Sequence, residues 1–93
     1  EVALASFECS ATTNFALTEV IDAGTRSSAK AAINGLSAGG STSIGYGLQK
    51  AYDILSGAGA AGCFESVVLL SDGQQNCGAA PGSVLPALKA RKV

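Results

Sequence analysis

The sequence predicts an α/β fold with the element order β-β-α-α-β-α. The first observation is the run from Val67 to Leu70, where four apolar residues, two of them β-branched, stand between polar flanks. So short an apolar run is typical of a strand buried on both faces, and we expect that strand to span residues 64–71. The second observation is that two stretches upstream of it carry apolar residues at helical spacing. Helices that alternate with strands favour a sheet covered on both faces.

Two strands are expected at the start of the chain. Residues 2–7 are apolar apart from Ser6, which favours a strand, and residues 9–14 are rich in Ser, Thr and Asn, which favours a turn or short loop. Residues 15–20 then alternate between apolar and polar side chains, as in an edge strand half exposed to water. Because the loop between them is short, the two strands are predicted to form an antiparallel hairpin.

Three helices are expected after this hairpin. Residues 22–25 interrupt the pattern, and the first helix follows them with an amphipathic stripe. The second helix starts after a cluster of hydroxyl side chains that can cap it, and Gly57 can end it. The third helix follows a polar loop over residues 74–80. The residues behind these predictions are Ala29, Ala32, Ile33 and Leu36 for the first helix; Ser41, Thr42 or Ser43 as caps and Ile44, Leu48, Ala51, Tyr52 and Leu55 on one face for the second; and Ser83 as cap, Pro86 in the first turn and Lys89, Arg91 and Lys92 near the negative end of the helix dipole for the third.

Composition excludes several classes of function. The chain has 93 residues, enough for one small domain, and a net charge of −1 with its six basic residues scattered along it. This charge gives no electrostatic footprint for nucleic acid, and no apolar run approaches the roughly 18 residues that cross a bilayer. The sequence has no histidine, so the commonest general base and transition-metal ligand is missing. We therefore expect no nucleic-acid partner and no membrane insertion of this segment.

The three cysteines, Cys9, Cys63 and Cys77, form no Cys-x-x-Cys pair, which argues against a zinc site. Three cysteines can form one disulfide and leave one free thiol, or they can all remain thiols. Cys63 and Cys77 would lie beyond opposite ends of the expected strand at 64–71, too far apart to bond unless the loop folds back. Cys9 and Cys77 both follow the carboxyl ends of strands, so we favour that pairing.

Two polar clusters are candidates for a binding site. Residues 40–45 open the second helix, and residues 71–74 follow the expected third strand. In an α/β sheet both can lie on the same rim, where they would bring together a hydroxyl and a carboxylate, the oxygen ligands that Mg2+ or Ca2+ prefers. The alternative is that the hydroxyls are helix caps and Asp72 is a turn residue.

These features, in this order, resemble the von Willebrand factor type A (VWA) domain. That family has an amphipathic helix, a Gly-Gly-Thr-x-Ile-Gly segment that opens a second helix, and an apolar strand that ends in Thr-Asp-Gly. The chain is similar at residues 40–45, where Ser41 replaces the second Gly, and at residues 67–73, where Ser71 replaces the Thr. Residues 2–7 look like the family's second strand, so the resemblance covers almost all of the chain.

The resemblance implies a Rossmann-like, three-layer sandwich with a metal-ion-dependent adhesion site on its upper rim. By that resemblance Thr42 binds Mg2+ (or Mn2+ or Ca2+) directly, Asp72 binds it directly or through water, and an acidic residue of a protein partner completes the coordination. The family's Asp-x-Ser-x-Ser motif, on its central first strand, is absent from this sequence. We therefore expect residues 1–93 to be a partial VWA-like domain with part of the metal site, and it stays open whether this segment alone binds a cation.

The missing central strand has a physical consequence. The strands at Val2 and Val67 would each expose an unpaired edge, which could pair with the other, with a second copy of the chain or with a strand of a partner. Self-association is therefore an expected property. The cysteines resemble those of secreted or cell-surface members of the family, which favours an extracellular or cell-surface location.

The leading interpretation is a non-enzymatic protein–protein interaction or adhesion module of the VWA type. In this interpretation Ser43, Tyr46 and residues 74–76 line the same rim as Thr42 and Asp72 and would shape the partner surface. The first alternative is a VWA-like subunit or domain of a larger enzyme or ATPase/chelatase assembly. Against it, the sequence has no histidine and no P-loop. The second alternative is a structural α/β domain without a functional metal site.

Overall fold

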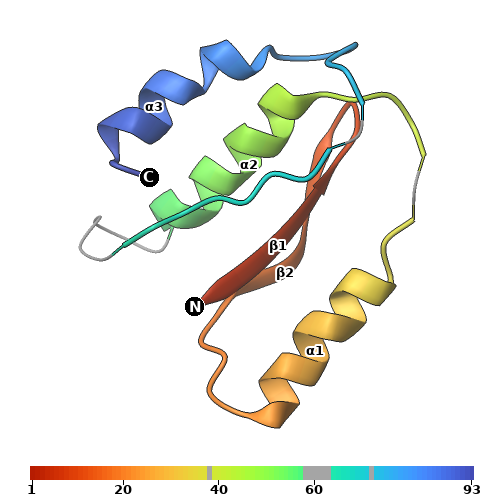
Figure 1. The fold of residues 1–93 in the computed structure, drawn as a ribbon, viewed down its shortest axis with the longest axis vertical. Coiled ribbons are helices and arrows are strands. Elements are labelled where there is room, and N and C mark those ends of the chain that lie inside the picture. The colour runs from red at the N-terminus through yellow and green to blue at the C-terminus, as the bar shows by residue number, and fades with distance from the viewer. Residues whose placement is uncertain (38, 58–63, 72) are drawn as a thin grey trace.

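The computed structural model describes residues 1–37, 39–57, 64–71 and 73–93. Figure 1 shows a β-hairpin that lies between one helix, α1, and a pair of helices, α2 and α3. No helix in the described part of the chain is long and apolar enough to span a membrane. The elements are β1 (Val2–Phe7), β2 (Ala11–Thr18), α1 (Ala23–Asn34), α2 (Ile44–Gly57), a 3-10 turn η1 (Pro81–Ser83) and α3 (Leu85–Ala90).

The predicted antiparallel hairpin is confirmed, but its turn is shorter than expected. Phe7 pairs with Ala11 and Val2 with Thr18, so only three residues connect the strands. The Glu8 N–H donates to the Ser10 carbonyl at 2.7 Å and closes this turn. The loop predicted over residues 9–14 was wrong from Ala11 onward, because the β-branched residues that follow it are well suited to a pleated strand.

Helix α1 begins three residues earlier than its apolar stripe indicated. Asp22 caps it: the Asp22 carboxylate accepts the Thr25 N–H at 2.8 Å, and the Thr25 hydroxyl accepts the Asp22 N–H at 3.3 Å. The hydrogen bond from the Thr25 backbone lowers the pKa of Asp22, since it favours the charged carboxylate. The helix contacts both strands, yet none of its residues is buried, and Ile33 keeps 54% of its surface exposed.

The hydrophobic core is small and lies where α2 meets the C-terminal part of the chain. Its buried members are Leu48 of α2, Val84 after η1 and Leu88 of α3. Helix α2 also packs against both strands of the hairpin, which makes it the central element of the molecule. Four half-buried side chains complete the cluster: Ile44, Tyr52, Val67 and Val93.

The third strand predicted over residues 64–71 was wrong. No strand forms there, and no backbone–backbone hydrogen bond joins these residues to the rest of the described chain. The side chains still alternate: Val67 packs on the core, whereas Val68 and Leu70 are each 84% exposed. A strand is defined by its ladder, and the only sheet within the described residues has two strands, β1 and β2. The apolar run therefore has no neighbouring strand with which to pair.

The observed order is therefore β-β-α-α, then η1 and α3, and the expected three-layer sandwich is present only in part. The hairpin and three helices agree with an incomplete α/β, Rossmann-like domain. Pro86 lies in the first turn of α3 as predicted, but Ser83 is not its cap, since the Ser83 hydroxyl donates to the Ala80 carbonyl at 2.7 Å.

Arg91 holds the unpaired segment in place from outside the sheet. Its guanidinium donates to both carboxylate oxygens of Glu65, at 2.8 and 2.9 Å. It also donates to the Leu55 carbonyl at 2.7 Å, within the last turn of α2. The sequence suggested that Arg91 serves the end of its own helix. The structure places this cation at the negative end of α2, where it satisfies a carbonyl that has no partner within that helix.

Candidate functional site

The first turn of α2 is capped by Ser43, one of the three predicted candidates. The Ser43 hydroxyl accepts the Tyr46 N–H at 3.3 Å, which is the usual geometry of a capping serine. The same hydroxyl donates to the Ala79 carbonyl at 3.4 Å, and the Ser43 side chain is fully buried. The Ser43 N–H donates to the Glu8 carbonyl at 2.8 Å, which joins α2 to the turn of the hairpin.

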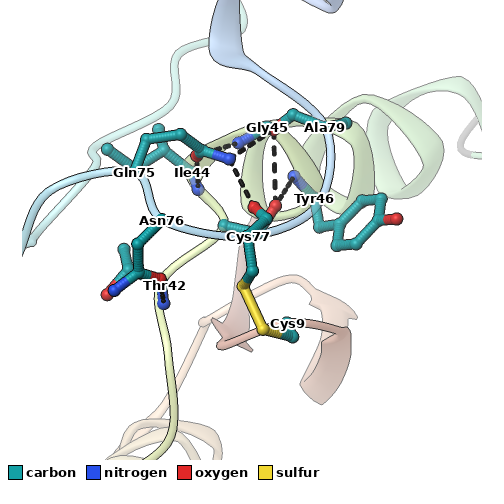
Figure 2. Close-up of a disulfide and its surroundings, with 10 residues drawn as sticks. Cys9, Thr42, Ile44, Gly45, Tyr46, Gln75, Asn76, Cys77 and Ala79 are labelled. Atoms are coloured by element: carbon teal, nitrogen blue, oxygen red, sulfur yellow. Dashed lines mark hydrogen bonds between the residues drawn. A yellow bond between two sulfur atoms is a disulfide. The ribbon is translucent and has the colours of Figure 1, made fainter.

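A second capping group comes from the loop over residues 73–80. The Gln75 side-chain oxygen accepts the N–H groups of Ile44 and Gly45, at 2.6 and 3.4 Å. Its amide nitrogen donates to the carbonyls of Cys77 and Ala79. Figure 2 shows this amide between the helix start and its own loop. One side chain therefore satisfies two orphan donors of α2 and folds the loop around itself.

Thr42 lies directly before this capped turn, and its backbone is held on both sides. The Thr42 N–H donates to the Asn76 side-chain oxygen at 2.6 Å, and the Thr42 carbonyl accepts the N–H of Asn76 at 2.9 Å and of Cys77 at 3.3 Å. The Thr42 hydroxyl makes no hydrogen bond to another described residue. A side chain on Gly73 would come within 2.8 Å of that hydroxyl oxygen, so Gly73 lies against Thr42.

This contact brings the two predicted clusters together at one rim. Asp72 itself lies outside the described residues, and Gly73 follows it in the sequence. Ser71, on the other side, forms a local turn in which its hydroxyl donates to the Gly73 carbonyl at 3.3 Å. The rim therefore contains Thr42 together with the residues that flank Asp72.

A disulfide between Cys9 and Cys77 fixes the rim to the hairpin, as the sequence favoured. The two Cα atoms are 5.7 Å apart, and the bond links the β1–β2 turn to the loop that carries Gln75 and Asn76 (Figure 2). Cys63 lies outside the described residues. Two glycines permit the close approach of helix and loop, because a side chain on Gly45 would overlap the Ala79 carbonyl and one on Gly78 would overlap the Tyr46 ring.

A family model for the von Willebrand factor type A domain matches residues 1–93, the whole of the sequence. The chain belongs to the VWA family. A search of curated proteins and of solved structures finds no significant match. Membership of the VWA family agrees with the order of the motifs and with the Rossmann-like class of the fold.

The described residues of this VWA chain provide few metal ligands. No group of three or more His, Cys, Asp or Glu side chains within them could hold a metal ion. The Thr42 hydroxyl fits a hard cation, since it is an oxygen ligand and has no hydrogen-bond partner among the described residues. Asp72 would be the second ligand, and the sequence offers no Asp-x-Ser-x-Ser motif for the others.

Sequence reasoning placed residues 74–76 on this rim as part of a partner surface, but it missed the hydrogen bonds of Gln75 and Asn76 to the start of α2. Both belong to a polar loop, and neither lies in a periodic pattern or a capping-box spacing relative to α2. Their contacts join residues more than 30 positions apart, from Asn76 to Thr42 and from Gln75 to Ile44. The only local sign was the run of amides over residues 74–76, which is compatible with many loops.

Proposed function

We propose that this chain is a non-enzymatic, cation-dependent protein-recognition module of the VWA type. In this proposal Thr42 and Asp72 bind a divalent cation, which is Mg2+ or, in its place, Mn2+ or Ca2+. An acidic residue of a protein partner completes the coordination. The observation that carries the proposal is the contact of the Thr42 hydroxyl oxygen with Gly73, the residue that follows Asp72. It supports a shared site because Gly73 follows the other proposed ligand, Asp72, directly in the chain.

The surroundings of Thr42 support its role as a ligand. The backbone on both sides of its side chain is held by Asn76, so the hydroxyl has a fixed position without being consumed by an internal hydrogen bond among the described residues. A fixed, available oxygen is suited to Mg2+, which demands near-octahedral geometry and gives up its water reluctantly. The bound cation would supply a positive charge that a carboxylate of the partner can bind.

The disulfide supports an extracellular or cell-surface location for this module. Disulfides persist in oxidising compartments and are rare in the cytosol, where thiols are kept reduced. The Cys9–Cys77 bond lies at the proposed recognition rim, so its loss would affect the binding region directly. Partner binding outside the cell agrees with the presence of this disulfide and with its place at the rim.

The proposal is tested by Mn2+ and Mg2+ calorimetry on this chain and on the same chain joined to a strand that carries Asp-x-Ser-x-Ser. We expect the joined protein to bind the cation, because that strand would provide the missing oxygen ligands. Thr42→Val and Asp72→Asn should each weaken binding by more than about tenfold, since the loss of groups that only orient a ligand already costs about ten- to a hundredfold.

The matched control is Thr13→Val, which removes the same hydroxyl from an exposed position on β2. It should leave cation binding unchanged. Absence of binding in both proteins, or equal binding by wild type and the Thr42 and Asp72 variants, would contradict the proposal. Thr42 and Asp72 would then be structural residues of a helix start and a turn.

A further inference from the structure

Glu8 places a carboxylate beside the loop that carries Thr42. It directly follows the last residue of β1, so it lies where the hairpin turn meets the start of α2. Its backbone carbonyl accepts the N–H of Ser43, the residue after Thr42, at 2.8 Å. Its carboxylate lies against Gly40, which precedes Thr42 by two residues. Glu8 therefore contacts the loop on both sides of Thr42.

The contact of this carboxylate with the loop depends on a glycine. Gly40 has a φ of 77°, in the left-handed region that side chains disfavour. A side chain at this position would also overlap a carboxylate oxygen of Glu8. Because Gly40 has no side chain, the carboxylate can approach the backbone of the loop closely, and no bulky group of Gly40 separates the two.

The backbone of Glu8 is held in position, whereas its carboxylate is unpaired. The Glu8 N–H donates to the Ser10 carbonyl at 2.7 Å, and the next residue, Cys9, is joined to Cys77 by the disulfide. The carboxylate makes no hydrogen bond or ion pair with another group in the part of the chain that the structure describes. Thr42 has the same combination of a held backbone and an available oxygen.

The negative charge of Glu8 supplies what the Thr42 hydroxyl lacks as a cation ligand. A hydroxyl is neutral, whereas Mg2+ in proteins is usually bound through one or two carboxylates and keeps several of its waters. Acidic side chains are scarce at this rim, since residues 1–37, 39–57, 64–71 and 73–93 contain no group of three that could hold a metal ion. A single carboxylate beside the Thr42 loop would therefore change the affinity of the site substantially.

We propose that the Glu8 carboxylate binds the same divalent cation as the Thr42 hydroxyl, directly or through one of the waters that the cation keeps. Resting on the proposed function, this role adds a ligand from the hairpin turn to the ligand at the helix start. Both residues belong to the 93-residue chain, so this chain should bind Mn2+ by itself, more weakly than the protein joined to an Asp-x-Ser-x-Ser strand.

The role of Glu8 is tested by titrating Mn2+ into the 93-residue chain and following its amide signals by NMR. Bound Mn2+ broadens the signals of nearby nuclei through its unpaired electrons, so the measurement locates the ion. We expect selective broadening at Glu8 and over residues 40–43, reversed by excess Mg2+. Glu8→Gln keeps the shape of the side chain without its charge, and it should weaken the Mn2+ affinity measured at residues 40–43 by more than about tenfold.

Thr42→Val distinguishes a shared cation from an ion bound by Glu8 alone. If the two residues bind one cation, loss of the Thr42 hydroxyl should also reduce the broadening at Glu8. The matched control is Glu19→Gln, which makes the same change at an exposed glutamate at the other end of the hairpin. It should leave the broadening over residues 40–43 unchanged. The amide chemical shifts of each variant without Mn2+ check that its fold is intact.

Four results would overturn the role of Glu8. They are the absence of selective broadening in the wild type, broadening over residues 40–43 that survives Glu8→Gln, an equal loss with Glu19→Gln, and broadening at Glu8 that Thr42→Val leaves unchanged. Calorimetry on the joined protein tests the proposed function separately. Cation binding there that needs Thr42 but not Glu8 would retain the proposed function and exclude Glu8 as a ligand.

Discussion

The segment over residues 64–70 and the loop over residues 73–79 follow one another in the chain, yet they are held in opposite ways. The first is apolar and extended and has no backbone hydrogen bond within the described residues. The second is polar and irregular, but it bonds to the start of α2 through Gln75 and Asn76 and to the hairpin through a disulfide. The stretch with the stronger secondary-structure signal is the less ordered by hydrogen bonds.

The difference teaches that a strand and a loop depend on different partners. A buried strand requires two flanking strands, and its apolar side chains give it no backbone pairing on their own. The loop over residues 73–79 requires only one helix start and one hairpin turn, and both are provided by this chain. The loop over residues 73–79 is therefore ordered by contacts within this chain, whereas residues 64–70 need a neighbouring strand to form backbone hydrogen bonds.

The largest expected effect comes from breaking the disulfide. Replacing Cys9 and Cys77 together by serine removes a cross-link between residues 68 positions apart, which should lower the free energy of unfolding by about 4 kcal/mol. Urea unfolding at low protein concentration measures this loss. Amide exchange at Ile44 and Gly45 should accelerate as the loop over residues 73–79 becomes free to leave α2.

Cys63→Ser is the control for the loss of a thiol without the loss of this cross-link. It should unfold at the same urea concentration as the wild type. If the Cys9/Cys77 double variant also keeps the wild-type midpoint, then hydrogen bonds alone hold the rim. The disulfide would then not contribute to the difference in order between the two segments.

Sequence patterns predicted the elements whose partners lie nearby in the chain. The strand Val2–Phe7 and the hairpin it starts were confirmed, as were two amphipathic helices, because turns and helices are formed by local contacts. The capping box at Asp22 was taken for a break, since its hydrogen bonds leave no apolar period. The strand at 64–71 was wrong because its apolar pattern reports burial, whereas pairing depends on a neighbour.

The candidate site, like the fold, could be predicted from the sequence only in part. Thr42 was singled out by its motif, and its role as a ligand stays a prediction. The pairing of Cys9 with Cys77 is confirmed, although the residues expected as a strand before Cys77 form none. Gln75 and Asn76 were expected on the rim, but their hydrogen bonds to Thr42 and Ile44 were not, because a side-chain amide that binds a distant backbone has no preferred spacing in the sequence. Asp72 stays a prediction, since it lies outside the described residues.

The second effect in size is expected at Gln75. Gln75→Ala leaves two helix N–H groups and two loop carbonyls without this partner, and we expect a loss of about 2 kcal/mol in the free energy of unfolding. Gln74→Ala is the matched control, because Gln74 is exposed and its side chain makes no hydrogen bond to a described residue, so it should change stability by less than about 0.5 kcal/mol.

Gln75→Glu divides the two functions of this amide. A carboxylate retains the acceptor at the start of α2, where the helix dipole favours negative charge, but it cannot donate to the carbonyls of Cys77 and Ala79. We expect an intermediate stability, with the amide of Ile44 still protected from exchange. Equal stability of Gln75→Ala and Gln74→Ala would mean that the disulfide alone orders the loop.

The smallest effect is expected at Arg91, whose side chain forms an ion pair with Glu65 of the weakly ordered segment. Arg91→Ala removes two hydrogen bonds to Glu65 and one to the Leu55 carbonyl. The pair is partly buried, with 13% and 14% of the two side chains exposed, but Glu65 can turn toward solvent once Arg91 is removed, so we expect a loss of about 1–2 kcal/mol. Chymotryptic cleavage after Phe64, Leu69 and Leu70 should accelerate, as should amide exchange in the last turn of α2.

Arg91→Lys and Lys89→Ala sharpen this test. Lysine keeps the charge but cannot make the two parallel hydrogen bonds of a guanidinium, so its effect should lie between those of wild type and alanine. Lys89 is exposed and its side chain has no bond to a described residue, so Lys89→Ala should leave exchange unchanged. If Arg91→Ala leaves residues 64–70 as resistant to cleavage as before, then the contacts of Val67 with the core are enough to hold the segment without a β-ladder.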